Sequence, residues 1–211
     1  MKIQEPKKDW KEAGFEHFLR IYKTLNPAQT AERCNLAFNR DKGFNIRLMG
    51  REYNVRHPDF RLIEPVSGEE NESFSEKTLV LRYLCEGVWT PCKGGRLSYR
   101  ETPWGETYFS NFEGRCVKRL ARAFGGDIQA FNLIFENNPQ LRGEKITKQT
   151  GFHFEFMSNL FFTFIIWPGD DEFPSQAQIL FDDNIPGAFS AEDLAVACDA
   201  AITRLKALQA R

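Results

Sequence analysis

Residues 152–183 read FHFEFMSNLFFTFIIWPGDDEFPSQAQILFDD, and this stretch decides the fold. Apolar and polar residues alternate over 152–156 and again over 176–181, which is the pattern of half-buried strands. Between them, an apolar run from Leu160 to Trp167 is interrupted only by Thr163 and is typical of a buried strand. Ser158-Asn159 can turn the chain between the first two strands. The stretch therefore predicts a three-stranded antiparallel meander.

Helical patterns surround the meander. Ser190 is a natural N-cap with Asp193 at the capping-box position, so a helix begins there and runs towards the C-terminus. Ser73 and Glu76 have the same spacing before a helix that ends at Gly87. Further elements are expected as helices over 7–25, 27–34 and 105–124, a strand at 97–99, and a hairpin over 44–55 that turns at Gly50-Arg51. We expect Gly125-Gly126 to end the third of these helices in the left-handed conformation.

These elements predict a single α+β domain over residues 1–211. Its sheet is antiparallel or mixed, includes the C-terminal meander, and has helices packed on it. The hydrophobic content of 42% and the 20 phenylalanines provide a large aromatic core. Residues 56–72 have no periodicity and are expected to form a loop.

Charge and composition exclude several classes of partner. The formal net charge of -1 provides no field to attract nucleic acid or an anionic membrane. The longest apolar run is far shorter than the roughly 20 residues of a membrane-spanning helix. The first residues carry charges without an apolar run, so we expect a cytoplasmic protein without a signal peptide. Five scattered cysteines without a CxxC pair predict reduced thiols rather than disulfides.

A His/carboxylate cluster is the first candidate site. Antiparallel pairing brings the start of the first meander strand towards the end of the second, so His153 and Glu155 are expected near Asp170. Imidazole and carboxylate groups together suit zinc, iron or manganese. The sequence therefore offers His153, Glu155 and Asp170 as a metal or acid/base site, with a solvated loop beside an exposed strand face as the alternative. Asp182 and Asp183 are expected about 15–20 Å away, at roughly 3.3 Å per residue of strand, and cannot share that site.

The loop after Trp167 is the second candidate site. It combines an indole that can stack on a planar ligand with Asp170, Asp171, Glu172 and Phe173. Tyr99 is expected nearby. These residues predict a surface for a small ligand or a protein partner, or a homodimer contact through the exposed aromatics. A solvated loop with Trp167 closing the core is the plainer interpretation.

Two further features have weaker functional interpretations. Cys92 lies in a loop outside the apolar periodic elements, and the adjacent Lys93 is expected to lower its pKa and favour the thiolate. One helix carries a basic outer face, which predicts a solvated surface or an anion contact and consists of Arg115, Lys118, Arg119 and Arg122.

Three segments together resemble the bacterial and archaeal family known as domain of unknown function 3786. They are LVLRYLCEG from Leu79, RLSYRETPWGETYFSNFEGR from Arg96 and WPGDDEFPSQAQILFDDNIPGAFSAEDLAV from Trp167. The resemblance implies an intracellular protein of anaerobes without an established activity. The resemblance also implies that in some members this domain is fused to a cysteine-rich iron–sulfur domain. This chain lacks a four-cysteine segment of that kind.

From these observations we expect a non-catalytic ligand- or protein-binding accessory module of anaerobic metabolism. The alternatives are a metal-dependent, hydrolase-like enzyme that uses the His153 cluster, and a homodimer-forming structural protein. No residue pattern specifies a cofactor, a substrate or the identity of the partner.

Overall fold

The strands form one nine-stranded sheet in the described part of the chain, residues 10–147 and 149–209 of a computed structural model. All paired strands are antiparallel and the main order is β4-β3-β2-β7-β8-β9-β5, with β1 beside β2 and β6 beside β7. The strands are β1 (Phe38–Asn39), β2 (Gly43–Leu48), β3 (Arg51–Val55), β4 (Leu62–Ile63), β5 (Arg96–Ser98), β6 (Glu144–Lys145), β7 (Gly151–Met157), β8 (Leu160–Trp167) and β9 (Gln176–Asp182).

The α-helices are α1 (Trp10–Thr24), α2 (Pro27–Arg33), α3 (Phe74–Glu86), α4 (Gly105–Phe112), α5 (Lys118–Phe124), α6 (Ile128–Asn137), α7 (Ile185–Ala188) and α8 (Ala191–Gln209). Short 3-10 helices cover Tyr99–Glu101 and Pro139–Leu141, and a π-helical turn covers Glu113–Val117. The structure confirms the predicted α+β fold with helices packed on an antiparallel sheet. Each helix in the described residues is too short or too polar to cross a membrane.

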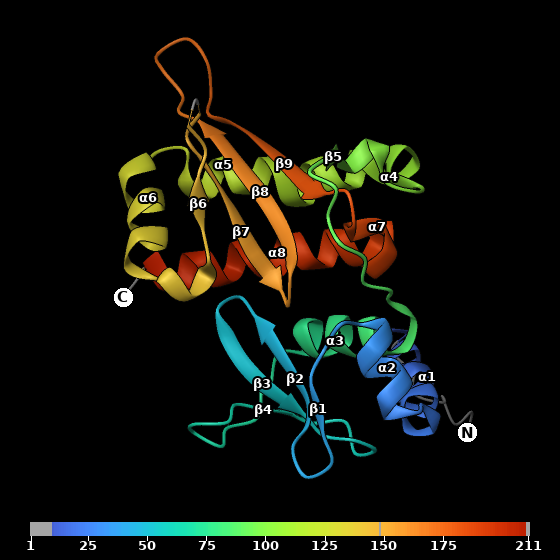
Figure 1. Cartoon of the computed structure of the whole chain (residues 1–211). Helices are drawn as coiled ribbons and strands as arrows, with labels where there is room; N and C mark the ends of the chain where they lie inside the picture. The colour runs from blue at the N-terminus through green and yellow to red at the C-terminus, as the bar shows by residue number, and fades with distance from the viewer. Residues whose placement is uncertain (1–9, 148, 210–211) are drawn as a thin grey trace, which may run out of the picture.

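The C-terminal meander is confirmed. Phe154 pairs with Phe162 between β7 and β8, and Phe162 pairs with Phe181 between β8 and β9. All three side chains are fully buried. Figure 1 shows α5 and α8 against one face of the meander. Within the core, the Phe162 and Phe181 rings meet edge to face with centroids 5.1 Å apart. The meander therefore forms the centre of the aromatic core, and α8 adds aliphatic side chains to the same hydrophobic cluster.

The N-terminal elements continue the sheet through a narrow junction. Among the described residues, one registered pair, Leu48 with Met157, joins β2 to β7. Figure 1 shows β1–β4 with α1–α3 below the meander. Across this junction α3 packs against α8. The hairpin is confirmed, but its turn is Met49-Gly50 rather than Gly50-Arg51. Both turn residues have positive φ, which matches the twist of a two-residue hairpin.

Helix caps explain where two buried helices begin. At α8, Ser190 N–H donates to Asp193 Oδ2 at 3.1 Å and Asp193 N–H donates to Ser190 Oγ at 3.3 Å, so the capping box is complete. At α3, Ser73 Oγ accepts from Glu76 N–H, but the Glu76 carboxylate binds Asn71 and Arg204 instead of closing the box. Only half of that predicted box forms.

Several elements differ from the sequence prediction. Helices α6 and α7 and the short strands β1, β4 and β6 were not predicted. Tyr99 begins a 3-10 helix rather than ending a strand, and the expected helix over 105–124 is interrupted by the π-helical turn. The left-handed cap at Gly125 is also wrong, because its φ is -66°. Glycine is needed there for another reason: an added Cβ would lie 2.3 Å from the Cβ of Ser175. The start of the expected first helix, residues 7–9, lies outside the described residues.

Candidate functional site

The structure separates the residues of the predicted metal cluster. His153 Nε2 lies 2.9 Å from Asp182 Oδ1, and its ring stacks on Phe161. Thr163 lies opposite both His153 and Leu180, so Asp182, two residues further along β9 on the same face, comes within reach of the imidazole. Asp170 accepts hydrogen bonds from N–H groups of its own loop. Among the described residues, no group of three His, Cys, Asp or Glu side chains is placed to hold a metal ion.

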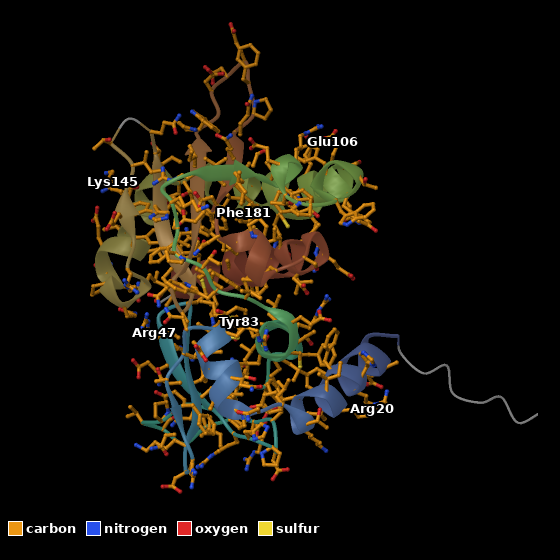
Figure 2. The ribbon with its side chains drawn as sticks, turned by 45° about the vertical axis from the view of Figure 1, so that its right-hand side comes forward. Arg20, Arg47, Tyr83, Glu106, Lys145 and Phe181 are labelled. Carbon is orange, nitrogen blue, oxygen red and sulfur yellow. The ribbon has the colours of Figure 1, made fainter. Side chains whose placement is uncertain are left out.

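Glu155 instead belongs to a structural ion-pair network. Its carboxylate accepts two hydrogen bonds from the Arg47 guanidinium and one from Arg142, each at 2.8 Å, and one from Asn159 N–H at 2.7 Å. Burial would raise the pKa of Glu155, but these hydrogen bonds and the two positive charges outweigh burial and lower it. In Figure 2, Arg47 lies near the boundary between the lower and upper parts of the molecule. The network therefore fastens β2 to β7 beside their one registered pair.

The acidic-aromatic loop, residues 167–175, connects β8 and β9 and projects from the end of the sheet (Figure 1). Trp167 is partly exposed, Asp170, Asp171 and Glu172 are exposed, and Phe173 is 62% exposed. Tyr99 does not join this surface. Its ring is buried, stacks on Phe112 at 3.8 Å, and its hydroxyl donates to Ala191 C=O at 2.9 Å.

A concave surface lies elsewhere, where α3, α4 and the start of α8 meet. Three adjoining hollows of about 740, 310 and 250 Å³ share lining residues there, and Arg82 of α3 lines all three. We call this region the Arg82 hollow. Its largest part is lined by Trp104, Tyr108 and Arg115 on one side and by residues of α8 on the other. The two larger volumes lie in the range of small-molecule sites.

Arg82 is held in the hollow by two contacts. Its Nη1 lies 2.9 Å from Asp193 Oδ1, and its guanidinium carbon lies 5.0 Å from the centre of the Phe18 ring. Asp193 Oδ2 is taken by Ser190 N–H and Oγ. The Nε of Arg82 is buried and has no hydrogen-bond partner among the described residues. A buried donor without an acceptor is costly and calls for an explanation.

Exposed aromatic side chains line the outer part of the hollow. Trp104 is 76% exposed and has a φ of 65°, in the left-handed region that residues other than glycine rarely adopt. The next residue must be glycine, because a Cβ at Gly105 would lie 1.7 Å from Tyr99 C=O oxygen. One turn along α4, Tyr108 is also exposed. The strained backbone at Trp104 therefore accompanies two exposed rings, those of Trp104 and Tyr108, beside Arg82.

The π-helical turn lies in the same wall. It covers Glu113–Val117 and therefore includes Arg115, whose Nη2 is 3.6 Å from Asp199 Oδ2. Single π-turns inside α-helices occur often at functional sites. The predicted basic face is largely paired, since Lys118 contacts Glu113 and Arg119 contacts Asp199.

Cys92 is not activated in the way the sequence predicted. The loop is exposed, but partial burial of the thiol raises its pKa, and the nearby carboxylates of Asp182 and Asp183 raise it further. The expected lowering of the pKa by Lys93 is therefore wrong. A thiol with a raised pKa is a poor nucleophile at neutral pH.

Sequence patterns missed the Arg82 hollow, although two signals were present. Arg82 interrupts the apolar face of α3 within LVLRYLC, where a charge has no packing role. The Pro103-Trp104-Gly105 tripeptide places a large aromatic residue in a turn. Neither signal shows that α3, α4 and α8 converge, because these segments are far apart in the sequence.

One comparison with known proteins gives a match. A family model described as a domain of unknown function (DUF3786) matches residues 26–204. No curated protein and no solved structure matches the chain. The matched range includes every element that lines the Arg82 hollow except α1, which precedes it.

Proposed function

We propose that this chain, which belongs to the DUF3786 family of unknown function, is a binding module that holds a small ligand in the Arg82 hollow without transforming it. The single observation that carries the proposal is the meeting of three adjoining hollows around Arg82, beside the exposed rings of Trp104 and Tyr108. Asp193 and the Phe18 ring hold the Arg82 guanidinium in place, so its positive charge has a defined position beside a ligand.

The aromatic lining supports a ligand with a planar group. Trp104 and Tyr108 expose their rings beside Arg82, and aromatic side chains of this kind stack on planar molecules. Left without a partner, such large exposed rings are unfavourable on a soluble surface. The left-handed backbone at Trp104 supports the same function, because strain of this type is found at ligand-binding positions.

The lining is better suited to holding a ligand than to proton transfer. Asp193 is committed to Ser190 and Arg82. The Tyr99 hydroxyl is committed to a backbone carbonyl, and burial raises the pKa of Tyr99 to about 12. A hydroxyl with this pKa keeps its proton near neutral pH. These commitments favour a non-catalytic role.

Ligand-observed saturation-transfer NMR with 2-naphthamide and 2-naphthoate tests the proposal. We expect at least one probe to bind saturably to the wild type, and Trp104→Ala to weaken that binding about 10-fold or more, because loss of a stacking partner costs roughly 1–3 kcal/mol. Trp167→Ala is the matched control, since it removes another exposed indole outside the hollow. Absence of saturable binding by both probes, or equal loss in both variants, contradicts the proposal.

A further inference from the structure

We infer that the part of the Arg82 hollow between α1, α3 and α8 is a subsite for an uncharged hydrocarbon group, a ring or a short branched chain. This part has a volume of about 310 Å³, and we call it the α1 subsite. The inference rests on the proposed function, because it assigns a ligand class to one part of the same hollow. The α1 subsite shares Arg82 with the part beside Trp104 and Tyr108, but neither of these two rings lines it.

Apolar side chains make the floor and the rim of the α1 subsite. Its apolar lining consists of Phe15 and Phe18 of α1, Phe74 and Leu79 of α3, and Val196 of α8. Leu79 is 1% exposed and forms the floor, whereas Phe74 is 44% exposed and forms the rim. An apolar cavity of roughly 150 Å³ can hold benzene. The α1 subsite is larger than this and therefore has room for a bicyclic ring.

Gly14 leaves space on the α1 side of the subsite. It lines the subsite from inside a helix, where glycine is less stable than alanine. Its φ is not positive, and a Cβ at this position would meet no described atom within 4 Å. Neither the backbone conformation nor close packing among the described residues therefore requires glycine here. The missing side chain instead keeps open the space beside the apolar walls, which a ligand needs.

The polar side chains that α3 contributes to the subsite already have partners within the protein. Thr78 Oγ1 donates to a backbone carbonyl of α3 at 2.8 Å, and Ser75 Oγ lies 3.2 Å from the hydroxyl of Ser73. Arg82 Nη1 lies 2.9 Å from Asp193 Oδ1. The unpaired Nε of Arg82 is buried, so a ligand in the subsite cannot reach it. A polar ligand group would have to displace existing bonds, and a hydrocarbon group would not.

The charges of the lining balance one another. Arg82 and Arg115 line the subsite together with Glu192 and Asp193, so the lining carries no net charge. An ionised ligand group would lose its hydration here without gaining an excess of opposite charge. An apolar group has no such hydration to lose, and its transfer out of water is favourable. The lining therefore favours an uncharged ligand group over an anion or a cation.

Titration of the full chain with 1-adamantanol, followed by ligand-observed saturation-transfer NMR, tests the inference. This probe is uncharged, compact and not planar, so it suits the α1 subsite and does not stack on an indole as a flat ring does. We expect saturable binding to the wild type. Gly14→Leu should weaken this binding about 10-fold or more, because the new side chain occupies the subsite.

Two comparisons control this experiment. Gly126→Leu is the matched variant, since a Cβ at Gly126 would also meet no described atom within 4 Å and Gly126 lies outside the hollow. It should bind 1-adamantanol as the wild type does. Adamantane-1-carboxylate has the same hydrocarbon body with a negative charge, and we expect it to bind about 10-fold more weakly than the alcohol.

The outcomes separate the inference from the proposed function. Saturable binding of a naphthyl probe without binding of 1-adamantanol overturns the inference and leaves a binding module. Equal binding of 1-adamantanol by wild type and Gly14→Leu, or binding of the carboxylate as tight as that of the alcohol, also overturns the inference alone. Absence of binding by every probe overturns both. Leucine favours a helix more than glycine does, so circular dichroism should show that Gly14→Leu melts no earlier than wild type and that weaker binding does not come from unfolding.

Discussion

Replacing Glu155 with glutamine should destabilise the protein through the junction between β2 and β7. The side chain is 1% exposed and receives hydrogen bonds from Arg47, Arg142 and Asn159 N–H. Removing one partner of a buried ion pair costs about 3–5 kcal/mol. Here Arg47 and Arg142 are 32% and 48% exposed, so water can hydrate both after the change. We therefore expect a loss of about 2 kcal/mol in the free energy of unfolding.

Urea unfolding followed by circular dichroism at pH 7 measures this loss. Glu106→Gln is the matched control, because it breaks the exposed Arg100–Glu106 pair and should cost less than about 0.5 kcal/mol. If Glu155→Gln changes the free energy of unfolding no more than the control, the network does not fasten the junction and the reasoning is refuted.

The same pair of proteins should show a defined pH dependence. The pKa of Glu155 is lower in the folded than in the unfolded state, so the ionised carboxylate stabilises the fold. Its contribution is fully present above the unfolded-state pKa, about 4.3, and is lost as the pH falls through the folded-state pKa. The difference between wild type and Glu155→Gln should therefore be constant from pH 7 to about 5 and shrink in acid. A constant difference down to pH 2 contradicts this linkage.

Three further predictions use single substitutions. Gly125→Ala should lower the free energy of unfolding in urea by about 1–3 kcal/mol, because the new Cβ meets Ser175. Neighbouring Gly126→Ala is the control, since its Cβ would meet no described atom within 4 Å. Equal losses in the two variants contradict the contact. Cys92 should be the first thiol to react with a disulfide reagent in the native protein, more slowly at pH 8 than free cysteine because its pKa is raised, and Cys92→Ser should remove that phase. If two copies join through the exposed Phe173, size-exclusion chromatography will show an apparent mass that rises with concentration and a Phe173→Asp variant that stays small; one unchanged mass in both proteins rejects the homodimer prediction.

Local patterns predicted the parts of the fold that local physics determines. The meander and the start of α8 at Ser190 follow from alternation and capping, which involve residues close in sequence. Helix α6 has a comparable local signal, since Asp127 caps it and Phe131 and Phe135 are buried one turn apart. Strand β4 has two residues, too few for any period to show.

The site depends on contacts that no local pattern contains. His153 was expected near Asp170 because pairing direction was predictable, yet the pairing across β8 brings it to Asp182. Glu155 and Arg47 are 108 residues apart, so their pairing depends on the complete fold. The hollow likewise requires α3, α4 and α8 to meet around Arg82. Residue types therefore indicate which kinds of contact His153 and Glu155 can make, while tertiary packing determines which residues they contact.

The π-helical turn of Glu113–Val117 also determines which way the side chains of α4 face. A turn of this kind is equivalent to an α-helix with one inserted residue. Deleting the exposed Gly114 would restore a regular helix and rotate everything before it by about 100°, one residue's share of a 3.6-residue turn. Tyr108 would then point away from Arg82 while the core side of α5 kept its place. The same rotation would turn the buried Phe112 away from Tyr99, so the π-helical turn lets one helical segment serve both the core and the aromatic wall.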